Sequence, residues 1–191
     1  MFRSHSLLTR QTDSEHSLAQ ADTILHQEAA NPDNKLTKAQ LRDLVQRIAH
    51  GLRYNYGVGA NGPNKDVVTV ISYGQILAPA VYLGIVAAGG VYSAASPSST
   101  VAELQRQVEI GHSRLLVCGA EHADVALSAA RRCGFAERDV LLLDSTWQSW
   151  KLQSLNGKAN AMSDGRLQWQ IITDPKLLAE SLITILWSSG K

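Results

Sequence analysis

The chain has 191 residues, of which 45% are hydrophobic and 18% are charged. Eighteen Lys and Arg residues stand against 17 Asp and Glu residues, so the net charge is +1. This balance excludes charge-driven binding of nucleic acid and argues against a charge-rich disordered chain. The length predicts roughly one domain that buries a substantial core without disulfide bonds.

Cysteine and histidine usage predicts no metal centre. Cys118 and Cys133 are too few for a disulfide scaffold or an all-cysteine zinc site, so we interpret both as small packing residues in a reducing compartment. The six histidines show neither H-E-x-x-H nor another paired spacing. We interpret them as surface or core residues.

No targeting or membrane segment is predicted. Residues 1–35 lack the apolar core of a signal peptide, and their acidic residues argue against a transit peptide. Residues 67–102 contain no charged residue, but their helical part, residues 76–88, is shorter than the roughly 20 residues that cross a bilayer. We therefore expect an intracellular protein with no membrane span.

The first strong element is an amphipathic helix over residues 38–53. Thr37 and Gln40 have the spacing of a capping box, and Leu36 and Leu41 occupy the positions of a hydrophobic staple. Apolar residues then recur at helical spacing through Leu52. The preceding residues 1–35 are polar and weakly patterned, so we expect loose structure there rather than the helix that residues 18–30 could carry.

Strands and helices then alternate along the chain. The pattern predicts strands at 66–72, 91–94, 115–118, 140–143 and 182–187, and helices at 75–88, 100–110 and 120–133. An irregular stretch over 145–175 and a helical turn at 176–181 precede the last strand. The predicted class is α/β, with a mainly parallel sheet flanked by helices. In such sheets ligands bind at the carboxyl ends of the strands.

Three motifs suggest a nucleotide-binding or catalytic site but do not meet the requirements of one. Residues 57–62 match G-x-G-x-x-G, but a helix precedes them and a strand follows, the reverse of a dinucleotide site. We interpret them as a helix-to-strand connection. Gly190-Lys191 would need a glycine at position 185 to end a Walker A loop, and that residue is Ile185. Asp144 fits a turn or a helix cap, and no catalytic residue is assigned.

Several segments in order resemble the N-terminal part of the adenylate-forming (AMP-binding) superfamily, on its acyl-CoA synthetase and 4-coumarate–CoA ligase branch. The similar segments are TKAQLRDLVQRIAHGL (37–52), DVVTVIS (66–72), ILAPAVYLGIVAAGGVYSAASP (76–97), STVAELQRQVEIGHSRLLVC (99–118), AARRCGFAERDVLLLD (129–144) and ITILWSSG (183–190). The chain departs from the family at Tyr73-Gly74, where Pro-Asn is usual, and at His112, where Gly is usual.

The resemblance implies that residues 36–191 are a partial adenylation domain, the incomplete N-terminal subdomain of the fold, and that residues 1–35 lie outside it. It also implies ATP-dependent activation of a small carboxylic acid to acyl-AMP and then acyl-CoA, with ATP, Mg²⁺ and CoA as cofactors. Relatives sometimes carry a C-terminal peroxisomal address, so the resemblance implies a cytoplasmic or a peroxisomal protein. Ser188, Ser189 and Gly190 would form the first half of the phosphate loop. The family continues that loop with Thr, Gly, Pro and Lys, whereas here Lys191 follows Gly190.

Three functional hypotheses follow. The leading one is a fragment of an acyl-CoA ligase, inactive alone, whose inherited substrate is a fatty-acyl or natural-product precursor of secondary metabolism. The alternative is a non-catalytic interaction or regulatory remnant that pairs with an intact ligase, or with itself, through an open sheet edge. The third is a small Rossmann-like nucleotide binder, which a titration with ATP, AMP and NAD tests.

Overall fold

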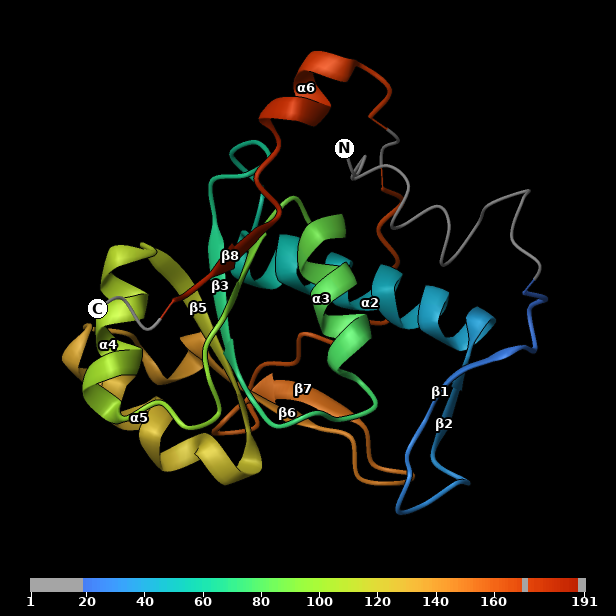
Figure 1. The fold of residues 1–191 in the computed structure, drawn as a ribbon, viewed down its shortest axis with the longest axis horizontal. Helices are drawn as coiled ribbons and strands as arrows, with labels where there is room; N and C mark the ends of the chain where they lie inside the picture. The colour runs from blue at the N-terminus through green and yellow to red at the C-terminus, as the bar shows by residue number, and fades with distance from the viewer. Residues whose placement is uncertain (1–18, 170–171, 189–191) are drawn as a thin grey trace.

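Six strands form one sheet in the order β7-β6-β5-β3-β4-β8 (Figure 1), within residues 19–169 and 172–188, which the computed structural model describes. β3, β4, β5, β6 and β8 pair in parallel, and only β7 runs antiparallel, against β6. The predicted α/β class with a mainly parallel sheet is confirmed. The strands are β3 Val67–Ile71, β4 Val91–Ala94, β5 Ser113–Gly119, β6 Val140–Asp144, β7 Lys151–Ser154 and β8 Thr184–Leu186.

Side chains of the central strands alternate between two hydrophobic layers, as the two-residue period of a strand requires. Val68 and Val70 of β3 pack in the layer of α2 and α3, whereas Ile71 of β3 and Leu116 of β5 pack in the layer of α4 and α5. Figure 1 shows these two helix pairs on opposite faces of the sheet. Because these strands are buried on both faces, their sequences are continuous runs of apolar residues. The helices are α2 Lys38–Tyr56, α3 Ala78–Ala87, α4 Val101–Ile110 and α5 Ala123–Arg132.

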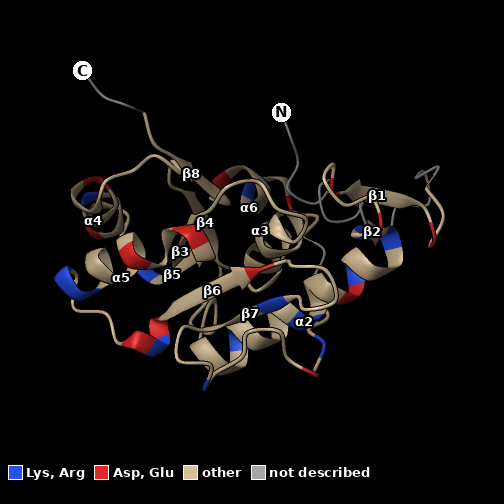
Figure 2. Cartoon of the chain, turned by 90° about the horizontal axis from the view of Figure 1, so that it is seen from below, with Lys and Arg blue, Asp and Glu red and all other residues tan. Residues whose placement is uncertain are grey.

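Charged residues lie mainly outside the centre of the sheet. Figure 2 shows the charged residues mostly on the helices and connecting loops. β3, α3 and β4 all lie within the uncharged stretch 67–102. The central part of the sheet is therefore held by apolar burial and backbone hydrogen bonds rather than by ion pairs.

Helix α2 begins and packs as predicted. The Thr37 hydroxyl accepts a hydrogen bond from the Gln40 N–H (3.3 Å), and the Gln40 side-chain oxygen accepts one from the Thr37 N–H (2.9 Å). This confirms the capping box. The helix runs three residues beyond the predicted end, to Tyr56, and Gly57 caps it in the left-handed conformation. Its buried apolar side chains are Leu41, Leu44, Val45, Ile48, Ala49, Leu52 and Tyr56.

Residues 24–27 form a strand and not part of the helix considered for residues 18–30. β1 (Ile24–Gln27) pairs antiparallel with β2 (Lys35–Thr37), and β2 leads directly into α2. The intervening turn is closed by the Asn34 N–H, which donates to the Asn31 carbonyl (2.9 Å). Pairing with residues just before α2, rather than local periodicity, determines the secondary structure of this segment. The domain boundary at residue 35 stays a prediction.

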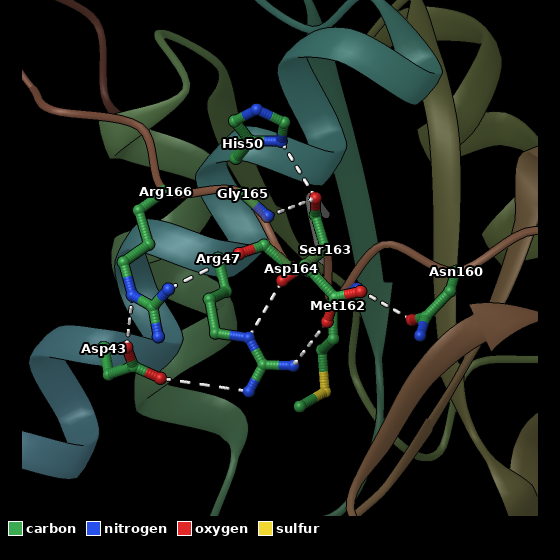
Figure 3. A network of polar contacts seen from close by, with 9 residues as sticks. All are labelled: Asp43, Arg47, His50, Asn160, Met162, Ser163, Asp164, Gly165 and Arg166. Carbon is green, nitrogen blue, oxygen red and sulfur yellow. Dashed lines mark hydrogen bonds and ion pairs between the residues drawn. The ribbon is translucent and has the colours of Figure 1, made fainter.

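The stretch predicted to be irregular, 145–175, contains one strand that the sequence analysis did not find, β7. Its continuation over residues 160–167, here called the strap, crosses α2 (Figure 3). The strap is fixed to the helix by backbone hydrogen bonds from Ser163 N to the Arg47 carbonyl (3.4 Å) and from Leu167 N to the Gln46 carbonyl (3.0 Å). The short helix α6 (Pro175–Glu180) confirms the predicted turn, and β8 lies within the predicted last strand.

The G-x-G-x-x-G segment is a helix-to-strand connection, as expected. The Gly59 N–H donates to the Asp66 carboxylate (2.7 Å), and Arg114 pairs with that carboxylate at 3.3 Å. A side chain on Gly59 would collide with the Ala88 carbonyl, and its φ of +70° also favours glycine. These contacts hold a turn between α2 and β3 and leave no helix N-terminus for a pyrophosphate.

A second capping box, at the start of α4, predicts a pH-dependent contribution to stability. The Thr100 N–H donates to the Glu103 carboxylate (2.8 Å), and the Thr100 hydroxyl also donates to it (2.9 Å). These hydrogen bonds, the backbone one first, lower the pKa of Glu103. A carboxyl whose pKa is lowered by folding stabilises the fold above its unfolded pKa, and this contribution is lost as pH falls through the folded pKa.

Glu103→Gln is therefore expected to lower the free energy of unfolding at pH 7 and to have a smaller effect near pH 3, because the stabilisation is lost as pH falls through the lowered pKa of Glu103. Urea unfolding at both pH values measures this. Glu109→Gln, near the other end of α4, is the matched control and should not show the same loss at pH 7. An effect of Glu103→Gln that stays equal at both pH values would contradict the assignment.

The two cysteines are expected to differ in reactivity. Cys118 is fully buried in β5, and burial, aided by the nearby Glu121 charge, raises the pKa of its thiol to about 12. Cys133 is partly exposed, and both thiols are free. In the native protein at pH 8, iodoacetamide should modify Cys133 and leave Cys118 unmodified until the chain unfolds, because only the thiolate reacts. Peptide mass spectrometry measures this, and rapid native labelling of Cys118 would refute it.

Candidate functional site

The carboxyl ends of the parallel strands meet at one edge of the sheet, where ligands bind in this class of fold. Most of the segments that leave these ends are rich in hydroxyl and amide side chains, and the one after β5 carries Glu121 and His122. They comprise residues 72–75 after β3, 95–100 after β4, 120–122 after β5, 145–150 after β6 and 187–188 after β8. Three clusters of polar contacts lie along this edge.

The first cluster joins β8 to β4. Ala94 pairs with Leu186, so both strands leave the sheet at the same point. The Trp187 indole N–H donates to the buried Ser93 hydroxyl (2.9 Å), which fixes the chain where it leaves β8. Ser188 follows and is exposed. On the neighbouring loop the Ser96 and Ser98 hydroxyls bond to each other at 2.8 Å and are also exposed.

The second cluster lies where β3 and β5 end. The Glu121 carboxylate accepts from the Tyr73 N–H (3.1 Å) and lies 3.1 Å from Nδ1 of His122. Burial raises the pKa of Glu121, but the backbone N–H donors and His122 outweigh it, so the net shift is downward. His122 is buried, and its Nε2 lies 2.9 Å from the Pro97 carbonyl. The two residues thus tie three strand-end loops together.

The third cluster connects β3 and β6 to the β1–β2 turn. Gln75 donates to the Ser72 hydroxyl (2.7 Å) and accepts from the Ser145 hydroxyl (2.9 Å). The Ser145 carbonyl accepts from the fully buried Asn34 amide (2.9 Å). The Asn34 amide oxygen in turn accepts from the Trp150 indole N–H (3.1 Å). These hydrogen bonds connect the loops after β3 and β6 to the β1–β2 turn.

Of the predicted phosphate-loop residues, the structure places only Ser188, at the carboxyl end of β8. Ser189 and Gly190 lie outside the described residues. Asp144 is confirmed as a turn residue, because its carboxylate accepts from the Thr146 N–H (2.9 Å) and hydroxyl (2.6 Å). Glu121 falls in the helix predicted over residues 120–133, but in the structure it lies in the 3-10 turn after β5 and bonds across to β3. Its position directly after a strand is the signal that could have found it.

This edge fits a phosphate group only in part. Around Ser188 it offers hydroxyl groups and backbone N–H groups, which are phosphate donors. The loops after β3 and β4 belong to the uncharged stretch 67–102 and bring no cation. Within the described residues, no group of three or more His, Cys, Asp and Glu side chains is placed to hold a metal ion. Also within that part, no helix is both long and apolar enough to cross a membrane.

Comparison with known proteins identifies this arrangement. A family model described as "AMP-binding enzyme" matches residues 16–190. A protein of Emericella nidulans, named provisionally as an acyl-coenzyme A synthetase, is 42% identical over 96% of this chain and 33% of its own length. A phenylacetyl-CoA ligase of Aspergillus niger is 27% identical over 85% of this chain and 30% of its own length.

The same fold occurs in a solved structure. ATP-bound MatB from Rhodopseudomonas palustris superposes with a TM-score of 0.67 at 22% identity, over 99% of this chain and 33% of MatB. This chain therefore spans about a third of the length of the proteins that it matches. The family match also begins at residue 16, inside the segment 1–35 that the sequence resemblance left out.

Proposed function

Because this chain belongs to the AMP-binding enzyme family, among adenylate-forming acyl-CoA ligases, we propose that it supplies the N-terminal third of an ATP-dependent acid–thiol ligase. The reaction is activation of a small carboxylic acid, a fatty-acyl or natural-product precursor, to acyl-AMP and then to acyl-CoA. By itself the chain is catalytically inactive. Residues 36–191 form its partial adenylation domain.

The β8–β4 corner is the observation that carries this proposal. β8 pairs with β4, the Trp187 indole fixes the following backbone, and Ser188 leaves the sheet exposed at its carboxyl edge. We assign Ser188, Ser189 and Gly190 to the first half of the phosphate loop, where hydroxyl and backbone N–H groups hold ATP phosphates. ATP neutralised by Mg²⁺ supplies the activating group when bound, and CoA accepts the acyl group.

A fusion tests the proposal. Residues 1–191 replace the matching third of the Emericella nidulans relative, and ATP-dependent acyl-CoA formation is measured with a panel of carboxylic acids. We expect activity from the fusion, and a loss of about tenfold or more when Ser188 and Ser189 are both alanine, because phosphate donors are removed. Ser128→Ala, on α5 and away from the sheet edge, is the matched control. An inactive but folded fusion would overturn the proposal.

The isolated chain gives the complementary measurement. It is expected to catalyse no exchange of pyrophosphate into ATP, because the described residues supply few phosphate donors and no group of metal ligands. Exchange above background by the isolated chain would refute its inactivity. The same preparation, titrated with ATP, AMP and NAD at millimolar concentration, tests independent nucleotide binding.

One observation favours the alternative function, a non-catalytic partner of an intact ligase. β8 is at the end of the sheet, so one of its edges is unpaired within the described residues, and Leu182 and Leu186 are 47% and 78% exposed there. An apolar strand edge is a template for pairing with another chain. If this function holds, the chain should co-purify with the intact relative or with itself, and Leu186→Lys should abolish the association while Leu177→Lys, on α6, should not.

A further inference from the structure

A pocket separate from the sheet edge near Ser188 opens beside the first half of α2. It has a volume of about 730 Å³ and is bounded by α2, by the turn after β6 and by the strap. This volume is in the range of sites for small organic molecules. Its lining includes Trp147, Trp150, Met162, Arg47 and Asp43. We propose that this pocket binds a flat aromatic carboxylate.

The apolar part of the pocket is built from two indole rings and a thioether. Trp150 is held in place, since its indole N–H is bonded to the buried Asn34 side chain (3.1 Å). Trp147 is 42% exposed, and none of its side-chain atoms has a bonding partner among the described residues. A planar aromatic ligand stacks on such faces, and the Met162 sulfur also favours an aromatic ring. The pocket thus combines one fixed aromatic wall with one aromatic wall that ligand binding would cover.

The charged residues that line the pocket are one cation, Arg47, and one carboxylate, Asp43. Arg47 uses its Nε to bond the Ser163 carbonyl (2.8 Å), which leaves both terminal nitrogens near the pocket. Those nitrogens lie 3.8 Å from Asp43 and 4.0 Å from Asp164, the outer limit of an ion pair. Asp43 has a shorter partner, Arg166 at 2.6 Å (Figure 3). A guanidinium with two loosely held nitrogens favours a carboxylate, which it binds in a two-pronged geometry.

The occupant is therefore an aromatic ring on the Trp147 and Trp150 faces with its carboxylate on Arg47. A neutral aromatic lacks a partner for the cation, and an aliphatic acid lacks the stacking surface. The site uses none of residues 188–190, so it stands independently of the function proposed above.

Calorimetric titration of the full chain with 1-naphthoate tests the site, with 1-naphthalenemethanol as the uncharged comparison. We expect saturable binding of naphthoate with quenching of tryptophan fluorescence, and binding of the alcohol at least tenfold weaker. Trp147→Leu should weaken naphthoate binding about tenfold, through lost stacking. Arg47→Gln should weaken it by a similar or larger factor, through lost charge-assisted hydrogen bonds.

Two matched variants serve as controls for the loss of an aromatic ring and of an arginine. Tyr54→Leu removes an aromatic ring that is 66% exposed elsewhere on α2, and Arg106→Gln removes an exposed arginine on α4; both should bind naphthoate as the parent does. Arg47 also holds the strap, so circular dichroism must show native folding in its variant. Trp147→Leu supplies the independent result, because that indole has no hydrogen bond to lose within residues 19–169 and 172–188.

Three outcomes would overturn the proposal. The first is a folded parent chain that binds no naphthoate at millimolar concentration. The second is equal binding by the parent, Trp147→Leu and Arg47→Gln. The third is a dimer, detected by light scattering, that Trp147→Leu dissociates, because the pocket would then be an interface between two copies of the chain.

Discussion

Asn34→Ala is expected to lower the free energy of unfolding by about 3 kcal/mol, because it leaves buried polar groups without partners. Asn34 has no exposed surface, and its amide donates to the Ser145 carbonyl (2.9 Å) and to the Glu28 carboxylate (2.6 Å). Its oxygen accepts from the Trp150 indole (3.1 Å). One side chain thus joins the β1–β2 turn to the loop after β6. Urea unfolding followed by circular dichroism measures the loss.

Asn34→Asp separates the contributions of this amide. It keeps an acceptor for Trp150 but removes the donor to Ser145 and places a charge beside Glu28, so it should also destabilise strongly. Asn61→Ala, at an exposed position in the α2–β3 connection, is the control and should change stability by less than about 0.5 kcal/mol. A loss for Asn34→Ala no larger than the control's would show that water replaces the missing bonds.

Ile48→Ala is expected to cost about 3 kcal/mol, since it deletes a fully buried side chain between α2 and α3. Gly84 of α3 lies directly against this residue, and a Cβ added at Gly84 would lie 2.5 Å from Ile48 Cγ2. Gly84→Ala should therefore cost about 1 kcal/mol or more, although alanine is the better helix former. Urea unfolding of each variant measures both losses.

The double variant Ile48→Ala/Gly84→Ala tests whether the two losses in the free energy of unfolding come from one shared contact. Removing the Ile48 side chain opens space for the new methyl group, so the combined loss should be smaller than the sum of the single losses. Gly74→Ala, where a new Cβ meets no atom within 4 Å, is the steric control. Strict additivity of Ile48→Ala and Gly84→Ala would mean that the helices move apart instead of clashing.

Much of the sheet could be predicted because its signals are local. The run at β3 is buried on both faces, and the capping boxes at Thr37 and Thr100 mark helix starts within a few residues. β7 escaped prediction because four residues, Lys151 to Ser154, give too short an alternation, and only antiparallel pairing with β6 makes them a strand. β1 was not predicted for the same reason, because it becomes a strand only by pairing with β2.

The candidate site was less predictable than the fold. That Ser188 follows a strand could be inferred from position alone. The contact of Glu121 with Tyr73 joins residues 48 positions apart, and that of Asn34 with Ser145 joins residues 111 apart. Such contacts depend on strand order and on side-chain direction, which no local spacing encodes. The pocket at Arg47 likewise exists only after the strap has crossed α2.

The place of β8 in the sheet has a consequence for how the protein is made. β8 pairs with β4, and 89 residues separate the end of β4 from the start of β8. During translation β4 is therefore an open edge of the growing sheet until residue 186 has left the ribosome. That edge belongs to a stretch of 36 residues, 67–102, without a single charge to repel a neighbouring nascent chain. In the interval between synthesis of β4 and of β8, the unpaired edge of β4 is therefore a template on which strands of other chains could pair.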